Sequence, residues 1–150
     1  MNERKDKHMI KVETLGMIDV AKINPVLKAE KAVKNYSFMT DNEVVYLISN
    51  TVVGDHAYNK DEVFAAGEYL NGYEVAVWKN QKLVIDEEHI AYAEGKGYAD
   101  LEAGVSMLTI NEDGTLAVAD AAPASGVYFV VTDKVMLTGK AVKARVMIAG

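Results

Sequence analysis

The sequence contains no cysteine, so disulfide bonds, thiolate metal sites and cysteine nucleophiles are all excluded. Histidine is also scarce: His8, His56 and His89 are scattered, and none has a second histidine at metal-ligand spacing. Long apolar runs are missing, since the longest, such as Val127–Val131, fall far short of the roughly 18 residues that span a bilayer. The charged N-terminus, which no apolar stretch follows, predicts that there is no secretory signal. We therefore expect no membrane partner.

Motifs for catalysis or cofactor binding are equally scarce. The densest set of potential metal ligands is Asp86–His89, but successive residues of a strand alternate faces, so at most two of these side chains would meet one ion. A solvated strand end or loop explains this segment better than a metal site. Residues 111–114 resemble the start of a calcium loop, yet they lack the alternating oxygen ligands and the distal glutamate that such a loop needs. The sequence therefore predicts no enzyme activity, no cofactor and no metal.

Charge is plentiful, and it is sorted along the chain. Residues 41–133 carry 17 Asp or Glu and only 4 Lys or Arg, a net charge of −13. Residues 1–40 have a net charge of +3, and residues 134–150 have a net charge of +4 with no acidic residue. The net charge of −6 for the whole chain thus conceals an acidic middle between two basic ends. This distribution favours an oriented contact with a partner and disfavours nucleic acid, because the acidic middle repels phosphate.

The pattern of apolar residues predicts a fold that is mostly β. The chain has 150 residues, of which 50% are hydrophobic and 25% charged, which is a globular composition with enough residues for a real core. Alternating, β-branched and aromatic runs are typical of strands. They predict strands at Val44–Ile48, Tyr73–Trp78, Leu83–Ile85, Met107–Ile110, Leu116–Ala119, Val127–Val131, Val135–Leu137 and Ala141–Ile148.

One helix is expected near the N-terminus, from Pro25 to about Lys34, because proline favours the first helical position and apolar residues follow it. Residues 1–9 show no periodicity and predict a mobile arm. No change in composition marks a linker, so residues 10–150 are expected to form a single β-rich domain. The predicted fold class is α+β but predominantly β: a small antiparallel barrel or sandwich with one or two short helices.

Two tight turns are expected. Asn71-Gly72 favours a turn between strands at Val63–Leu70 and Tyr73–Trp78, although a capped helix over residues 61–71 is the alternative. The helix is weaker because Gly67 would lie near its middle. The second turn, at residues 112–114, is expected to join the strands Met107–Ile110 and Leu116–Ala119 into a hairpin.

Aromatic residues gather in the acidic middle of the chain. Exposed tyrosine or tryptophan beside acidic groups can bind sugars or proteins, because each ring offers apolar area with a polar group at its edge. Packing of a small β core explains the same residues better. The residues concerned are Tyr58, Tyr69, Tyr73, Tyr92, Tyr98 and Trp78.

Three segments carry a resemblance to a known family: LGMIDVAKINPVLKAEKAV near the start, FAAGEYLNGYEVAVWKNQKLVIDEEHIAY in the middle, and SGVYFVVTDKVMLTGKAVKARVMI at the end. In the general pattern of residue types and in the order of segments, most of residues 10–148 resembles the decoration (cement) proteins of tailed bacteriophage heads. The resemblance implies a β-rich virion protein without enzymatic activity, which binds over an assembled capsid shell, clamps neighbouring subunits and stabilises the particle. It offers no catalytic signature and no family residues that can be transferred to positions here.

The sorted charge and the resemblance together predict how such a protein would bind. We expect residues 1–20 and the basic segment 134–148 to contact the major capsid protein, with the acidic segment 55–102 facing outward. The protein would act as a homo-oligomer on the capsid surface of the virion, and would lie in the host cytoplasm during assembly. The residues expected to contact the capsid are Arg4, Lys5, Lys7, Lys11, Lys134, Lys140, Lys143 and Arg145.

Two other functions fit the sequence. One is a different phage structural component, such as a tail-tube or head-completion protein. The other is a carbohydrate-binding β-module that uses Trp78 and the tyrosines.

Overall fold

A computed structural model describes residues 10–12, 21–48, 63–136 and 139–150, and in these residues the chain is mostly β. Short 3-10 helical turns occur at η3 (Val75–Trp78), η4 (Glu87–His89) and η5 (Tyr98–Asp100), and the described residues contain no α-helix. The strands are β1 (Ile10–Val12), β2 (Ile23–Lys28), β3 (Val33–Lys34), β4 (Phe38–Asp41), β5 (Val44–Ile48), β6 (Val63–Phe64), β7 (Tyr69–Glu74), β8 (Lys82–Asp86), β9 (Ile90–Ala91), β10 (Met107–Ile110), β11 (Leu116–Ala119), β12 (Gly126–Met136) and β13 (Lys140–Ala149).

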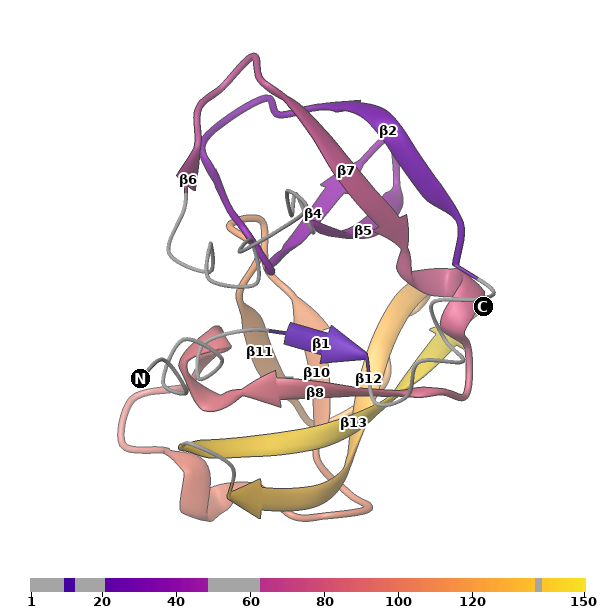
Figure 1. The fold of residues 1–150 in the computed structure, drawn as a ribbon. Helices are drawn as coiled ribbons and strands as arrows, with labels where there is room; N and C mark the ends of the chain where they lie inside the picture. Colours follow the sequence, from indigo (N-terminus) through magenta and orange to yellow (C-terminus); the bar gives the residue numbers. More distant parts are fainter. Residues whose placement is uncertain (1–9, 13–20, 49–62, 137–138) are drawn as a thin grey trace.

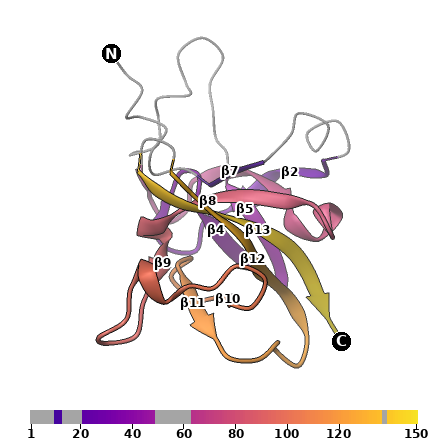
Figure 2. The same cartoon turned by 90° about the horizontal axis from the view of Figure 1, so that it is seen from below.

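The largest element is a seven-stranded sheet with the order β1-β8-β13-β12-β10-β11-β9. Its neighbouring strands run antiparallel except for β9 and β11, which pair in parallel. The long strands β12 and β13 form its central hairpin, in which the register shifts between Val131 and Asp133. The sheet curls into a half-barrel, which Figure 1 shows in the lower part of the molecule and Figure 2 shows from below.

A second sheet of four strands, in the order β2-β7-β5-β4, lies above the half-barrel in Figure 1. Strand β5 shows how this sheet uses both of its faces, since successive side chains of a strand point to opposite sides. Val45 and Leu47 pack into a large hydrophobic cluster shared with the half-barrel. Tyr46 and Ile48 pack into a smaller cluster on the other side, together with residues of β2, β6 and β7. The four-stranded sheet is therefore buried on both faces over part of its area.

Two aromatic pairs join the layers. Phe38 of β4 stacks on Phe129 of β12, with the ring centroids 5.2 Å apart. Trp78, at the end of η3, is fully buried and stacks on Tyr73 of β7 at 5.8 Å. Because buried aromatic rings remove a large apolar area from water, these pairs contribute strongly to the contact between the two sheets.

The helix expected from Pro25 to Lys34 is wrong, because this segment forms β2 and β3. Leu27 and Ala29 are buried in the smaller cluster, while Lys28 between them is exposed, and this alternation has the period of a strand. The register of β2 against β7 shifts between Asn24 and Leu27, so proline lies in a bulge, where its missing N–H costs no ladder hydrogen bond.

The turn expected at Asn71-Gly72 is also wrong, because both residues lie inside β7. A Cβ atom on Gly72 would lie 2.8 Å from Leu27 Cδ2 and 3.0 Å from Tyr46 Cβ, so glycine is needed here for close packing between strands. The chain turns earlier instead, at residues 65–68, where Gly67 has a φ of +95°. The C-terminal part of the expected strand Tyr73–Trp78 is the 3-10 turn η3, which buries Val75 and Trp78.

Other expectations from the sequence are confirmed. The strands Val44–Ile48, Met107–Ile110 and Leu116–Ala119 have the predicted bounds, and β10 and β11 form the predicted hairpin. The expectation of two strands at Val127–Val131 and Val135–Leu137 is wrong, because Gly126–Met136 forms the single strand β12, in which the register against β13 shifts between Val131 and Asp133. The expected arm, residues 1–9, lies outside the described residues, and the assignment of residues 10–150 to a single domain stays a prediction.

The turn of the β10–β11 hairpin generates a test of the fold. Gly114 has a φ of +89°, and a Cβ atom there would lie 2.5 Å from the backbone oxygen of Phe38. Gly95 has a similar φ of +81°, but no atom lies within 4 Å of its Cβ position. We expect Gly114→Ala to lower the free energy of unfolding by at least about 1 kcal/mol more than Gly95→Ala. Both substitutions place a Cβ atom on a residue with left-handed backbone angles, but only the alanine at position 114 would also clash with the backbone of Phe38. Urea denaturation measures the difference, and equal losses would contradict the packing described here.

Candidate functional site

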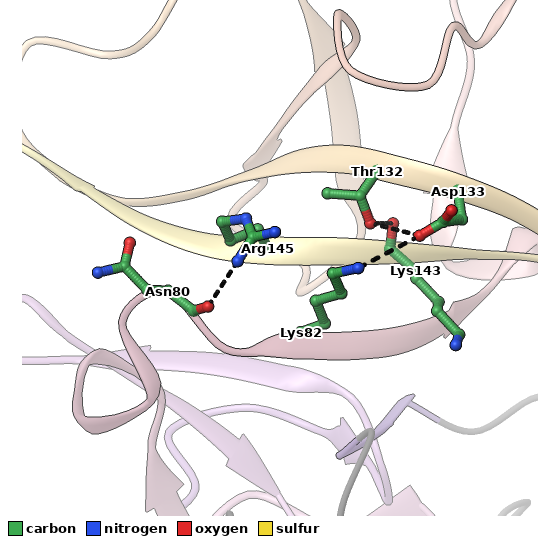
Figure 3. Close-up of polar contacts among 6 residues, drawn as sticks. All are labelled: Asn80, Lys82, Thr132, Asp133, Lys143 and Arg145. Carbon is green, nitrogen blue, oxygen red and sulfur yellow. Dashed lines mark hydrogen bonds and ion pairs between the residues drawn. The ribbon is translucent and has the colours of Figure 1, made fainter.

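Three cations share one face of the seven-stranded sheet, and we call this group, Lys82, Lys143 and Arg145, the basic face. Arg145 of β13 lies directly opposite Lys82 of β8 in the antiparallel register. Lys143 lies two residues before Arg145 on β13 and therefore points to the same side. All three residues are partly exposed. Figure 3 shows them along the neighbouring strands β8 and β13.

One carboxylate, that of Asp133, lies among these cations. The Nζ of Lys82 is 3.4 Å from Asp133 Oδ2, and the hydroxyl of Thr132 donates to the same oxygen at 2.9 Å (Figure 3). The Thr132 hydroxyl lowers the pKa of Asp133 below its ordinary value, and the charges of Lys82 and Lys143 act in the same direction. Asp133 is thus ionised at neutral pH and pairs with Lys82.

Arg145 is held on the opposite side of Lys82 from this carboxylate. Its Nη1 donates a hydrogen bond of 2.8 Å to the backbone oxygen of Asn80 (Figure 3). The turn that carries Asn80 is itself fixed to β13, since the N–H of Asn80 donates to the oxygen of Val146 at 2.8 Å. Asn80 has a φ of +72°, which asparagine adopts more readily than most residues. The turn thus orients the guanidinium away from the ammonium group of Lys82.

The other two cations expected from the basic segment, Lys134 and Lys140, do not belong to the basic face. Both lie beside the ring of Tyr98, with their Nζ atoms 4.7 Å and 5.6 Å from its centroid. Lys134 also donates to the backbone oxygen of Leu101 at 3.1 Å. The four expected cations at the C-terminal end are therefore divided between two environments. The alternation of side chains along β13 separates Lys140 from Lys143 and Arg145, and Lys134 of β12 lies opposite Val142 on the same side as Lys140.

Tyr98 closes the end of the β12–β13 hairpin. Its hydroxyl lies 2.7 Å from the backbone oxygen of Ala141 and 3.2 Å from that of Val135. Burial, together with the charge of Glu87, raises the pKa of Tyr98, so the phenol remains a neutral donor. The two lysines add cation–π contacts to this ring. Lys134 and Lys140 therefore have a structural role in this part of the molecule.

The remaining predicted contact residues lie near the N-terminus. Arg4, Lys5 and Lys7 are outside the described residues. Lys11 lies in β1, where its backbone is paired with Val84, which is in turn opposite Lys143. The register thus places Lys11 in the same row of the sheet as a member of the basic face.

Sequence reasoning missed Lys82. It lies in the acidic middle, and nothing in its local sequence shows that β8 pairs with β13. The one available signal was its position directly before the predicted strand Leu83–Ile85. Because side chains alternate along a strand, Lys82 would point to the face opposite to that of Leu83.

The segment Asp86–His89 is a strand end followed by a capped turn, as expected, but it is not solvated throughout, because Asp86 and His89 are buried. The carboxylate of Asp86 caps η4 by accepting from the N–H of Glu88. Glu87 accepts from the hydroxyl of Tyr92 at 3.2 Å, and burial and this neighbour raise the pKa of Tyr92 well above its usual value. Glu88 pairs with Lys34 at 3.3 Å. Across the described part of the chain, no three His, Asp or Glu residues are placed to hold a metal ion.

Several of the described aromatic residues that the sequence left open for a sugar platform make contacts within the fold instead. Trp78 is fully buried, so its face is unavailable for stacking on a sugar. Tyr73 packs against it in the core, and Tyr98 holds the hairpin. Tyr69 is 65% exposed, but Lys28 lies over its ring at 5.9 Å. Tyr58 is outside the described residues.

Comparisons with known proteins add no identification. No family model, curated protein or solved structure matches this chain. In the described ranges, no helix has the length and apolar character needed to cross a membrane. The function is therefore argued from the arrangement of the residues themselves.

The contacts of Tyr98 predict a measurable loss of stability. Tyr98→Phe keeps the ring and its two cations but removes the hydroxyl from the oxygens of Val135 and Ala141. We expect the free energy of unfolding to fall by about 1 kcal/mol, the usual value of a hydrogen bond. The matched control is Tyr69→Phe, for which we expect a change within about 0.5 kcal/mol because that side chain is exposed. Chemical denaturation measures both, and an unchanged Tyr98→Phe would show that the hydroxyl does not hold the hairpin.

Proposed function

We propose that this chain is a non-enzymatic structural protein that binds the outside of a phage capsid shell and stabilises it. The single observation that supports this most is the basic face, a group of partly exposed cations on a rigid sheet in a chain whose net charge is −6. Such a face provides an oriented contact, because it attracts an acidic surface while the rest of the molecule repels one.

The placement of the cations refines the proposed contact. Lys143 and Arg145 remain in it, Lys82 joins them, and Lys134 and Lys140 leave it because they serve the Tyr98 contact. The basic N-terminal residues, Arg4, Lys5 and Lys7, remain a second proposed contact. The major capsid protein is the proposed partner, and the acidic segment 55–102, apart from strand β8 with Lys82, is proposed to face outward.

The energetics suit binding in many copies. A single exposed ion pair contributes only about 0–1 kcal/mol, so no one of these contacts would fix the protein to a shell. Two contacts made by one molecule, and repeated by its neighbours on a symmetric shell, raise the overall affinity far above that of each contact. The net negative charge meanwhile limits association between free copies. This balance supports a homo-oligomer that assembles on the capsid and gives a virion location, with the host cytoplasm as its location during assembly.

The fold proposed for this function is a small β domain, either an incompletely closed barrel or a sandwich. The curled seven-stranded sheet and the four-stranded sheet that shares its core support that description. A tail-tube or head-completion protein remains the alternative phage component. The carbohydrate-binding alternative loses its main residue, because Trp78 is buried.

The test uses shells assembled from the major capsid protein encoded in the same genome. We expect the purified chain to sediment with these shells at a saturating stoichiometry and to raise their melting temperature. Lys143→Glu combined with Arg145→Glu should weaken binding at least about tenfold, because both contacts become repulsive. Lys28→Glu with Lys31→Glu makes the same change of charge on exposed residues of the four-stranded sheet and its following turn, and should leave binding near the wild-type value.

Two outcomes contradict parts of this proposal. Absence of the wild-type chain from sedimented shells, together with rings or tubes of the isolated protein in electron micrographs, would favour the tail-tube or head-completion alternative. Unchanged occupancy after deletion of residues 1–9 would remove the arm from the contact while leaving the basic face in place.

A further inference from the structure

A cleft of about 490 Å³ lies where the seven-stranded sheet ends in β11 and β9 (Figure 2). Its lining comes from two segments, residues 92–106 between β9 and β10 and residues 118–120 at the end of β11. No residue of the basic face lines this cleft. It is therefore a separate surface, and its function is argued from its own residues.

Strand β9 pairs with only the first half of β11. The parallel ladder joins Leu116 to Ile90 and Ala117 to Ala91, and it ends there. On its other side, β11 pairs with β10 as far as Ala119. Among the described residues, the last part of β11 thus has no strand beside it at the edge of the sheet. An open strand edge of this kind can pair with an extended peptide.

The backbone of Val118 faces this open side. The N–H of Asn111 donates to the oxygen of Thr115 at 2.8 Å, and hydrogen-bonded pairs recur at every second residue of an antiparallel hairpin. Ala117 and Ala119 are therefore the residues of β11 whose backbone groups point toward β10. Val118, between them, directs its N–H and its carbonyl group to the outer side, where the ladder with β9 stops before it.

The side chain of Val118 continues a buried row of the sheet but is itself exposed. Val118 lies directly opposite Leu108, which in turn lies opposite Phe129. Residues directly opposite share a face of the sheet, and so does Leu116, two residues before Val118. Leu108, Leu116 and Phe129 are fully buried, whereas Val118 is 41% exposed. The row therefore ends in an apolar side chain that the fold leaves uncovered.

The segment that supplies the other part of the lining is fixed to the sheet. The N–H of Gly104 donates to the oxygen of Val131 at 2.6 Å, and the N–H of Val131 donates to the oxygen of Ser106 at 2.9 Å. Between these two anchors, Val105 lines the cleft and is 61% exposed. Two exposed valines thus line a preformed cleft, and exposed apolar area in such a place is typical of a binding surface.

The charged residues of the lining are mostly acidic. They are Asp100, Glu102 and Asp120, against a single lysine, Lys96. Asp100 accepts a hydrogen bond of 2.8 Å from the N–H of Gly97, whereas Glu102 and Asp120 carry exposed side chains without an ion pair in the described residues. Acidic groups beside apolar area attract a basic segment and repel both acidic segments and nucleic acid.

From these observations we infer that the cleft binds an extended peptide segment of another protein, in which a short apolar side chain is flanked by lysine or arginine. The apolar side chain covers Val118 and Val105, and the backbone of the segment lies alongside the open end of β11. The flanking cations face Glu102 and Asp120. The inference goes beyond the proposed function and does not rest on it, because no residue of the basic face takes part.

The probe is a short fluorescein-labelled peptide of alternating lysine and valine, measured by fluorescence anisotropy with the full chain. We expect saturable binding that weakens as salt is raised, because part of the contact is electrostatic. A peptide of alternating lysine and serine has the same charge without the apolar side chains. It should bind at least about tenfold more weakly, because it cannot cover the two valines.

Substitutions test each part of the lining. Val118→Ser and Val105→Ser should each weaken binding of the lysine–valine peptide about threefold to tenfold, because each removes apolar area from the contact. The matched control Val63→Ser changes a valine that is 59% exposed on β6, outside the cleft, and should leave binding unchanged.

The acidic residues have their own matched pair of variants. Glu102→Gln combined with Asp120→Asn should weaken binding about fivefold, as expected for the loss of two exposed charge contacts. Glu43→Gln combined with Glu112→Gln removes the same charge from exposed positions outside the cleft and should leave binding unchanged.

A thermal melt of each variant separates binding from folding. We expect all of them to melt cooperatively near the wild-type temperature, because the substituted side chains are exposed. If Val118→Ser does not fold, Val105→Ser tests the same contact from the segment between β9 and β10.

Methylation of peptide amides tests the alignment with β11. Alternate amides of an extended peptide point to the same side, so N-methylation of either the valines or the lysines should abolish binding while the other set is tolerated. Equal binding of the two methylated peptides would contradict pairing with the strand edge.

Four results would overturn the inference: no binding of the lysine–valine peptide by the wild type, equally tight binding of the lysine–serine peptide, equal weakening by the control variants, or self-association of the wild type that Val118→Ser abolishes. The last result, measured by analytical ultracentrifugation, would assign the cleft to a second copy of this chain. None of these results depends on whether the chain sediments with shells, so the inference and the proposed function can fail separately.

Discussion

Burial of Trp78 is the constraint on which much of this structure depends. The 3-10 turn η3 carries the chain from β7 of one sheet to β8 of the other, and it places the indole in the core that both sheets share. Directly after it, the N–H of Asn80 donates to the oxygen of Val146, and the N–H of Val146 donates to the oxygen of Gln81. These two hydrogen bonds fix the register of β8 on β13. The facing pair of Lys82 and Arg145 is a consequence of that register.

The seven-stranded sheet both stabilises the fold and carries the proposed contact. A rigid sheet presents cations more precisely than a loop does, because each side chain starts from a backbone position fixed by its neighbours. The same sheet places Lys134 and Lys140 against Tyr98, where they support the hairpin. The basic residues at the end of the sequence thus divide into two that contact the ring of Tyr98 and two that belong to the basic face. The proposed contact is narrower than the charge distribution alone suggests.

The parts of the fold that depend on local sequence were predictable, and those that depend on distant partners were not. The β10–β11 hairpin follows from its own turn residues, and the strand Val44–Ile48 follows from its β-branched and aromatic run. The segment after Pro25 has helical signals, but burial of Leu27 and Ala29 in the cluster with Tyr46, Ile48 and Leu70 favours a strand. Gly72 resembles a turn residue and instead permits close packing of Leu27 and Tyr46. Lys82 joined the site only through the pairing of β8 with β13.

The bulge in β2 has a consequence for how copies of this protein meet. β2 is an outer strand of the four-stranded sheet, where unpaired backbone groups would invite another chain to add a strand. Pro25 supplies no N–H, the shift of register near Val26 interrupts the regular spacing of backbone donors, and Lys28 adds an exposed charge. This edge is protected against open-ended stacking, a hazard for any protein that accumulates at high concentration before it finds its place. Any contact made at this edge therefore depends on side chains and not on backbone hydrogen bonds.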